Sequence, residues 1–160
     1  MSDLGHARTS LVARLGGATL ALAVAGIHIA DQGGFPGSME TPYVLVLFYV
    51  LEAVAVATAI AFLLPLGPRL TAAAWTTAAT VVAAGPLIGY SLSRGPGLPG
   101  YDEDRGNWTE PLGVASLVVE AALLIVSVMI VVTIRRSRRR REQPIDHRLS
   151  PSKSQLADRL

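Results

Sequence analysis

Four long apolar stretches, nearly free of charge, limit how this chain of 160 residues can fold. They cover residues 11–30, 43–64, 70–92 and 111–134. The length of each stretch matches the roughly 20 helical residues that are needed to cross a hydrocarbon core of about 30 Å. A membrane β-barrel would instead show short segments of alternating polarity. We therefore predict an all-α, polytopic membrane protein with four transmembrane helices. Pro42 and Pro111 favour the starts of the second and fourth helices, and Pro65 the end of the second.

The basic residues predict the orientation of these helices. Of the 14 Lys and Arg residues, 12 fall on the side of the two termini and the 64–69 turn, and only Arg94 and Arg105 fall on the other. The positive-inside rule then predicts that both termini are cytoplasmic. The outer loops carry six acidic residues against these two arginines, so the outer face is expected to be acidic. We expect residues 1–10 to be a cytoplasmic segment and residues 135–160 to be a basic, disordered cytoplasmic tail.

An alternative concerns the first apolar stretch, which also fits a secretory signal. Arg8 and Arg14 precede an apolar run that ends in Ala23-Val24-Ala25, a small-x-small cleavage pattern. Cleavage would make Gly26 the first residue and remove the first helix. The apolar run continues through Ile29, however, which favours a retained helix.

The two halves of the chain share a pattern that indicates a possible duplicated helical hairpin. Phe35-Pro36-Gly37 in the first outer loop corresponds to Leu98-Pro99-Gly100 in the second. A single glutamate follows each helix-starting proline, Glu52 at a step of ten and Glu120 at a step of nine. Both halves would cross in the same sense, which predicts a parallel repeat about an axis along the membrane normal.

Glu52 and Glu120 are the acidic residues inside the predicted helices. A carboxylate at the bilayer centre costs at least about 2.5–3.5 kcal/mol, so each needs a partner or a function. Both are about 13–15 Å from the outer start of their helices at 1.5 Å per residue. We expect them to meet near the midplane and, at neutral pH, to hold at least one proton unless a cation lies between them. The alternative is that hydrogen bonds to neighbouring groups give each glutamate a structural role only.

Each predicted helix carries one stripe of small or polar residues that is suited to the interior of a four-helix bundle. Tyr49 lies one turn outward of Glu52, and Ser116 one turn before Glu120, so we include both in the candidate ligand or proton site. The stripes are Gly17, Ala21, Ala25 and His28; Glu52, Ala55 and Ala59; Thr76, Thr80 and Ala84; and Gly113, Ser116, Glu120 and Ser127.

His28, Asp31 and Arg94 are further candidates on the outer side. His28 and Asp31 have the i, i+3 spacing that can share a metal, which Glu40 could complete. We expect His28 instead to be an interfacial residue about 10 Å above the glutamates. Arg94 either extends outward to the headgroups or reaches a carboxyl group, and the outward conformation is the expectation. No cofactor is indicated: His6 and His147 lie in the tails, so haem with two ligands from one chain is not expected, although a homodimer could pair two copies of His28.

The basic tail predicts contact with anionic lipid headgroups, at about 1 kcal/mol per basic residue. Nucleic acid is not an expected partner, because the tail lacks interleaved aromatic residues. The predicted partner is the lipid bilayer, and a second copy of the chain and a larger membrane complex both stay open as protein partners. The lipid-contact candidates are Arg135, Arg136, Arg138, Arg139, Arg140 and Arg141.

Three segments together resemble a group of small four-helix integral membrane proteins of actinobacteria. They are residues 89–94 (GYSLSR) with 97–100 (GLPG), residues 108–113 (WTEPLG) and residues 116–120 (SLVVE). The resemblance covers the third and fourth helices, about a third of the chain. It implies the four-helix fold and a bacterial plasma membrane, but it carries no assigned activity.

Two functions remain open at this point. The first is the binding or relay of a proton, a cation or a small ligand at the paired glutamates. The second is a non-catalytic structural or accessory subunit of a larger membrane complex. An enzyme is not expected, because the chain has no cysteine, phosphate-binding loop, dinucleotide fingerprint, zinc-protease motif or serine elbow.

Overall fold

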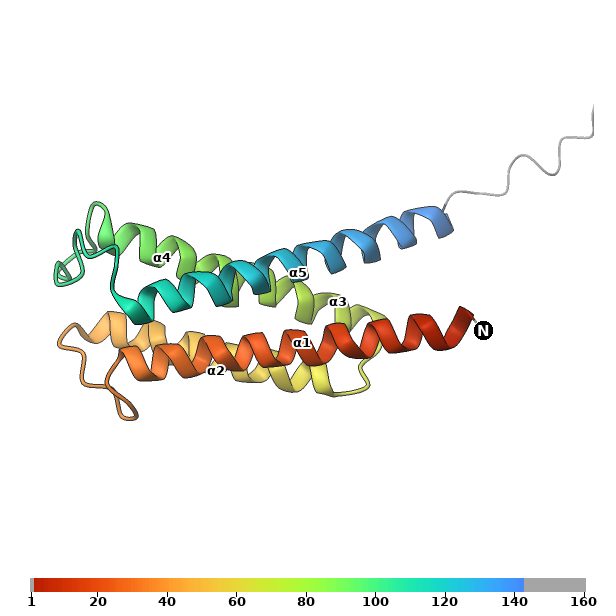
Figure 1. Ribbon diagram of the computed structural model, residues 1–160, viewed down its shortest axis with the longest axis horizontal. Coiled ribbons are helices and arrows are strands. Elements are labelled where there is room, and N and C mark those ends of the chain that lie inside the picture. Colours follow the sequence, from red (N-terminus) through yellow and green to blue (C-terminus); the bar gives the residue numbers. More distant parts are fainter. Residues whose placement is uncertain (1, 143–160) are drawn as a thin grey trace, which may run out of the picture.

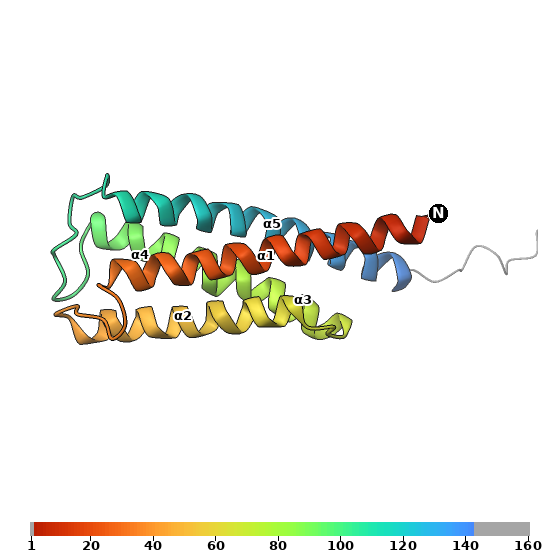
Figure 2. The same cartoon turned by 60° about the horizontal axis from the view of Figure 1, so that its bottom comes forward.

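The computed structural model describes residues 2–142, which form an elongated helical bundle (Figures 1 and 2). Its elements are α1 (Ser2–Asp31), α2 (Pro42–Leu63), α3 (Pro68–Thr77), the π-helical segment η1 (Ala78–Ala84), α4 (Gly85–Arg94) and α5 (Pro111–Glu142). Because α3, η1 and α4 follow one another without a break, the chain crosses the bundle four times. The predicted all-α fold with four long apolar helices is confirmed.

The boundaries of the membrane-spanning helices agree closely with the prediction. The helices long and apolar enough to cross a membrane are Leu11–Asp31, Pro42–Leu63, Pro68–Arg94 and Pro111–Arg139. Proline begins three of them, at Pro42, Pro68 and Pro111, where a missing backbone N–H leaves no helical hydrogen bond unmade.

Helix α5 extends beyond the expected end of the fourth span. The disordered tail was expected from Arg135 onward, but the helix continues to Glu142. Arginine is a good helix former, and no glycine or proline interrupts the sequence before Pro144. The expectation of disorder for residues 143–160 lies outside the described residues.

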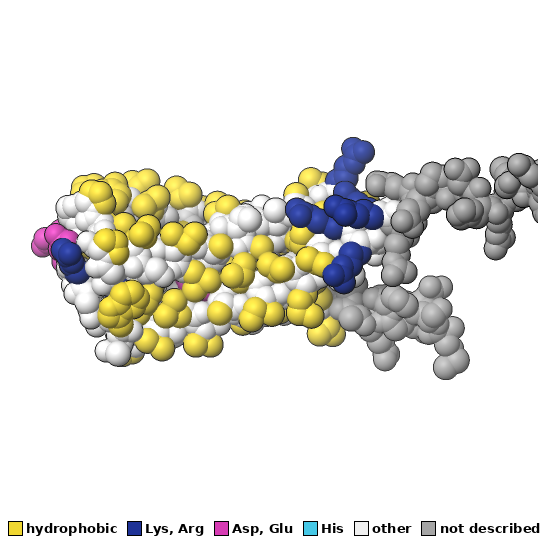
Figure 3. Space-filling view, turned by 90° about the horizontal axis from the view of Figure 1, so that it is seen from above, with side chains coloured by type: hydrophobic (Ala, Val, Ile, Leu, Met, Phe, Trp, Pro, Cys, Tyr) yellow, Lys and Arg dark blue, Asp and Glu magenta, His cyan; other side chains and the backbone are white. Residues whose placement is uncertain are grey.

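The two ends of the bundle differ in charge. We call the end that carries residues 32–41 and 95–110 the loop end, and the opposite end, where α1 begins and α5 finishes, the arginine end. Exposed arginine side chains gather at the arginine end, and acidic side chains at the loop end (Figure 3). At the arginine end, Arg14 of α1 donates to the backbone carbonyls of Phe62 (2.6 Å) and Leu64. It thereby satisfies carbonyl groups left over at the end of α2.

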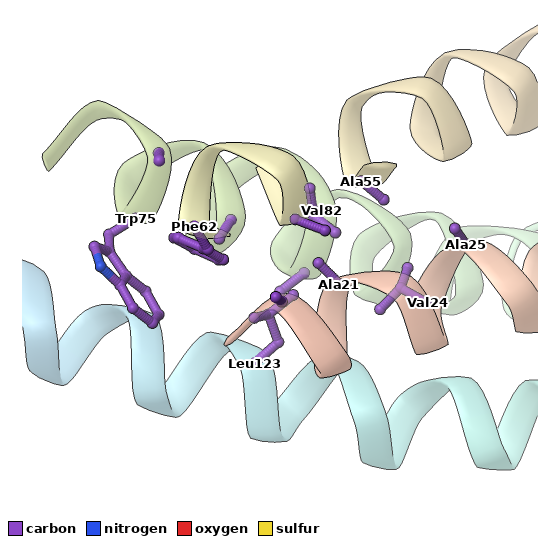
Figure 4. Close-up of a cluster of buried hydrophobic side chains, with 13 residues drawn as sticks. Ala21, Val24, Ala25, Ala55, Phe62, Trp75, Val82 and Leu123 are labelled. Carbon is purple, nitrogen blue, oxygen red and sulfur yellow. The ribbon is translucent and has the colours of Figure 1, made fainter. Parts of the chain in front are cut away.

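The hydrophobic core is built mainly from alanines, so that the helices approach closely. Ala21, Ala25 and Ala55 are 0–3% exposed, and Leu123 of α5 belongs to the same cluster and lies beside Ala21 (Figure 4). Phe62 and Trp75 close the core toward the arginine end, with ring centroids 4.2 Å apart.

Three of the four predicted interior stripes are confirmed, and the one predicted for the third span is wrong. The stripes of α1, α2 and α5 are buried throughout. In the third span, however, Thr80 is exposed and the buried face includes Trp75, Ala78 and Val82 instead. Thr76 and Thr80 each donate to the carbonyl four residues earlier, both at 2.9 Å, so these hydroxyls need no partner in the interior.

The π-helical segment η1 explains why an ideal helical repeat fails in the third span. Its wider turn changes which residues share a face. It ends just before Gly85-Pro86, and the Gly85 amide donates to the Thr80 carbonyl, five residues back. A proline ring clashes with the carbonyl four residues earlier in an α-helix, and a local π-helical adjustment is one way in which membrane helices accommodate a proline.

Candidate functional site

A cavity of about 310 Å³ lies among the four spans near the loop end. Its walls are mainly apolar, and every span contributes to them: Ile27 from α1, Phe48 from α2, Val81 from η1 and Leu112 from α5 are among the lining residues. The polar residues of the wall are His28, Asp31, Ser93, Arg94, Tyr101, Asp104, Ser116 and Glu120, with Tyr90 beside them.

Glu120 is the most deeply buried charged residue of this wall, at 1% exposure, and it has two partners. His28 Nε2 lies 3.1 Å from its Oε1 atom, and Ser116 Oγ donates to the same oxygen. The edge of the Phe48 ring meets the His28 ring, with centroids 5.0 Å apart. His28 Nδ1 is buried without a hydrogen-bond partner in the described structure.

The expectation that His28 sits about 10 Å above the glutamate level is therefore wrong. The two helices are antiparallel, and in an α-helix the Cα–Cβ bonds tilt toward the N-terminus. His28 thus leans toward the arginine end along α1, while Glu120 leans toward the loop end along α5. Counting backbone rise alone ignores this convergence of two long side chains.

Glu52 is buried as predicted, at 7% exposure, but it does not line the cavity. Its Oε1 atom has no hydrogen-bond partner, and within the described residues no hydrogen bond or ion pair joins it to Glu120. Both glutamates thus lie inside the bundle, and Glu120 pairs with His28.

Tyr49 is not part of the cavity either. Its hydroxyl accepts a hydrogen bond from the Gly37 amide at 2.9 Å, and its ring meets Phe35 edge-on at 5.6 Å. Tyr49 therefore holds the 32–41 loop against α2, a role that its place on the helix did not reveal.

Arg94 does not extend outward as expected, because the second loop folds over it and leaves it 6% exposed. Its Nη1 atom donates to Asp104 Oδ2 at 2.8 Å and to Ser93 Oγ at 3.0 Å. Its guanidinium carbon lies 4.3 Å from the centre of the Tyr90 ring. Arg94 Nε is buried without a partner in the described structure.

Tyr101 and Asp104 extend this network, and sequence reasoning missed both. The Tyr101 hydroxyl donates to Asp104 Oδ2 at 2.8 Å. Burial, followed by this hydrogen bond, raises the pKa of Tyr101 above its ordinary value, so the phenol stays a donor at neutral pH. The signal in the sequence was weak, because Asp104 is one of three consecutive acidic residues and only the folded loop distinguishes it.

The second loop covers the cavity and is attached to the first hairpin. Tyr43 at the start of α2 donates to the Pro99 carbonyl at 2.7 Å, and Thr41 donates to the Gly100 carbonyl at 3.2 Å. We call residues 98–104 the roof. Both hairpins are therefore needed to hold it in position.

Part of the cavity wall, between α2 and the third span, is exposed on the side of the bundle. Several lining residues are also exposed on the outer surface of the helices: Leu47 is 58%, Val50 52% and Val81 43% exposed. In this half of the bundle the backbone of α4 lies close to those of η1 and α5 but not to that of α2. These exposed apolar residues would face lipid, so we infer that the cavity has a side opening toward the membrane.

The alternative metal site at His28, Asp31 and Glu40 is not formed. Asp31 lines the cavity, but Glu40 is exposed in the loop. Across the part of the chain that the structure describes, no three His, Asp or Glu side chains are grouped closely enough to hold a metal ion.

The lipid-contact candidates lie at the arginine end. Arg135, Arg136, Arg138 and Arg139 are exposed, and Arg138 Nη2 donates to the Pro68 carbonyl at 3.3 Å. The side chains of Arg140 and Arg141 lie outside the described part. Contact with anionic lipid remains a prediction.

Fold and cavity together have the features of one class: multi-pass, all-helical membrane proteins with a chamber between their helices. Comparison with known proteins adds no closer relationship, since no family model, curated protein or solved structure matches the chain significantly.

Proposed function

We propose that this protein binds a small organic cation with an apolar body in the cavity near the loop end. In this proposal both termini are cytoplasmic, and the loop end faces outward. The supporting observation is the charge of the cavity wall, which holds three carboxyl groups, Asp31, Asp104 and Glu120, but only one arginine, Arg94.

The pairing of these groups leaves one carboxylate for a ligand. Arg94 is already bound to Asp104, and Glu120 to His28 and Ser116. Within the described residues, Asp31 has no ion pair. A cation in the cavity would complement Asp31 directly and gain from Glu120 deeper in the wall, because charges interact strongly where water is excluded.

The apolar walls support an organic ligand over a bare ion. An inorganic cation needs several oxygen ligands at short distance, whereas this wall is mostly aliphatic and aromatic. The volume of about 310 Å³ lies at the low end of the range for small-molecule sites. Phe48 and Tyr101 also offer aromatic rings, and ring faces attract cations.

Benzyltrimethylammonium is a suitable probe, with neopentylbenzene as its uncharged isostere. We expect calorimetry on the purified full chain in detergent to detect the cation and to find much weaker binding of the isostere. Asp31→Asn and Glu120→Gln should each weaken cation binding about tenfold or more, because each removes a carboxylate from a partly desolvated site.

Glu103→Gln is the matched control, since Glu103 is an exposed carboxylate of the second loop, also at the loop end, and does not line the cavity. It should change affinity less than twofold. Unfolding temperatures of all variants will show whether Glu120→Gln still folds, and Asp31→Asn tests the proposal independently. Equal affinity for the cation and its isostere, or no effect of Asp31→Asn, would overturn the proposal.

A further inference from the structure

A second, smaller cavity lies at the arginine end, between α3 and α5. Its volume is about 220 Å³. We call it the inner groove. It is lined by Ala72, Ala73 and Thr76 of α3 and by Val131, Ile134, Arg135 and Arg138 of α5. The α5 residues follow one another at steps of three, one and three, which puts them on one face of the helix.

The inner groove has an apolar part and a cationic rim. The only polar side chain of its α3 wall is Thr76, and its hydroxyl already donates to the Ala72 carbonyl. No acidic residue lines the groove, so Arg135 and Arg138 are not neutralised there. An occupant that complements this wall has a negatively charged end and an apolar chain.

The two arginines are suitably placed for a phosphate group. They are three residues apart on α5, so their side chains project from neighbouring turns of the same face. Arg138 makes a single, exposed hydrogen bond to Pro68, which steers its guanidinium toward α3 and leaves its other N–H groups available. Guanidinium groups bind phosphate through paired hydrogen bonds.

We propose that the inner groove is a binding site for one anionic phospholipid, with its phosphate at Arg135 and Arg138 and part of an acyl chain along Ala72, Ala73 and Val131. The position fits this occupant, because the groove begins where the apolar part of α5 gives way to the arginines, at the level of lipid headgroups. Free phosphate would use the rim but not the apolar part. This site is separate from the cation cavity.

Native mass spectrometry of the full chain, titrated with phosphatidylglycerol, tests the proposal. We expect one tightly retained lipid, and much weaker retention of phosphatidylcholine. Replacing both arginines, in Arg135→Gln/Arg138→Gln, should raise the dissociation constant about 25-fold, at about fivefold per basic residue near a headgroup.

The matched control is Arg136→Gln/Arg139→Gln, which removes the same charge from the same segment but from side chains that do not line the groove. We expect a change of less than threefold. Equal losses in the two double variants would show general charge attraction and overturn the site.

Two further measurements test the acyl-chain part. Ala73→Trp fills the groove without a change of charge, and we expect it to weaken phosphatidylglycerol binding at least fivefold. Thr76→Leu is a second filling variant, should Ala73→Trp fail to fold. If both leave the affinity unchanged, or if millimolar inorganic phosphate displaces the lipid, the site binds a headgroup alone and the proposal is wrong.

Discussion

Glu120 is held by side chains from two different helices, His28 of α1 and Ser116 one turn earlier on its own helix. This arrangement satisfies a buried carboxyl group and also links the first hairpin to the second inside the bundle. Glu52, by contrast, has a buried oxygen without a partner in the described structure. The two glutamates look alike in the sequence, but the fold gives them different neighbours.

Two serines on the same face of α5 allow a direct test of this arrangement. Ser116→Ala should lower the free energy of unfolding by about 1 kcal/mol, because it removes a hydrogen bond to a buried acid. Ser127→Ala should be neutral or slightly stabilising, since Ser127 Oγ is buried with no hydrogen-bond partner among the described residues. Unfolding in mixed detergent micelles measures both. Equal effects would mean that the Ser116 hydrogen bond adds nothing to stability.

Burial inside the bundle could be predicted for individual residues with polar or ionisable side chains, because such side chains are unfavourable in contact with lipid. Glu120 and Ser116, which share one face of α5, were recognisable as interior residues, and their burial is confirmed, whereas His28 was expected at the membrane interface. The pairing of His28 with Glu120 was not predictable, because it depends on how two antiparallel helices are offset. Tyr101 and Asp104 depend on the fold of the second loop, for which helical periodicity gives no information.

At the scale of the elements, the positions of glycine residues determine how closely two helices can pack. The α1 helix contains two consecutive glycines with opposite surroundings. A Cβ atom at Gly17 would lie 2.7 Å from the Trp75 ring and 3.0 Å from Phe62, whereas one at Gly16 would meet nothing within 4 Å. Only Gly17 thus allows α1 to approach the aromatic pair that closes the core.

We therefore expect opposite effects from the same substitution at these neighbouring positions. Gly17→Ala should destabilise the protein by about 1–3 kcal/mol, because the ring contact requires a shift in a packed core. Gly16→Ala should be neutral or stabilise it by up to about 1 kcal/mol, since alanine is the better helix former. Thermal unfolding of both variants in one detergent gives the comparison. Destabilisation by Gly16→Ala as well would contradict the assigned packing of α1.

The third span shows where helical periodicity stops being a guide. Its length and hydrophobicity predicted a membrane helix, which is confirmed. Its interior face was wrongly predicted because η1 breaks the regular repeat before Pro86. A proline in an apolar run indicates such an irregularity, but it does not tell on which side of the helix the change occurs.

At the scale of the whole molecule, the separation of charge between the two ends predicts the orientation in the membrane. The chain contains no cysteine, so single cysteines can report it directly. Asn107→Cys in the second loop should react with a membrane-impermeant maleimide in intact cells. Ser137→Cys near the end of α5 should react only after the membrane is opened. Both residues are exposed. The reverse labelling pattern would contradict cytoplasmic termini.

The side opening of the large cavity between α2 and the third span determines how an occupant arrives. A molecule that approaches from the aqueous phase encounters the roof, whereas one already dissolved among the acyl chains meets Leu47, Val50 and Val81 directly. Occupancy would then follow the partition coefficient of the molecule more closely than its concentration in water. Two cations of equal intrinsic affinity could therefore differ greatly in apparent potency, in proportion to their solubility in lipid.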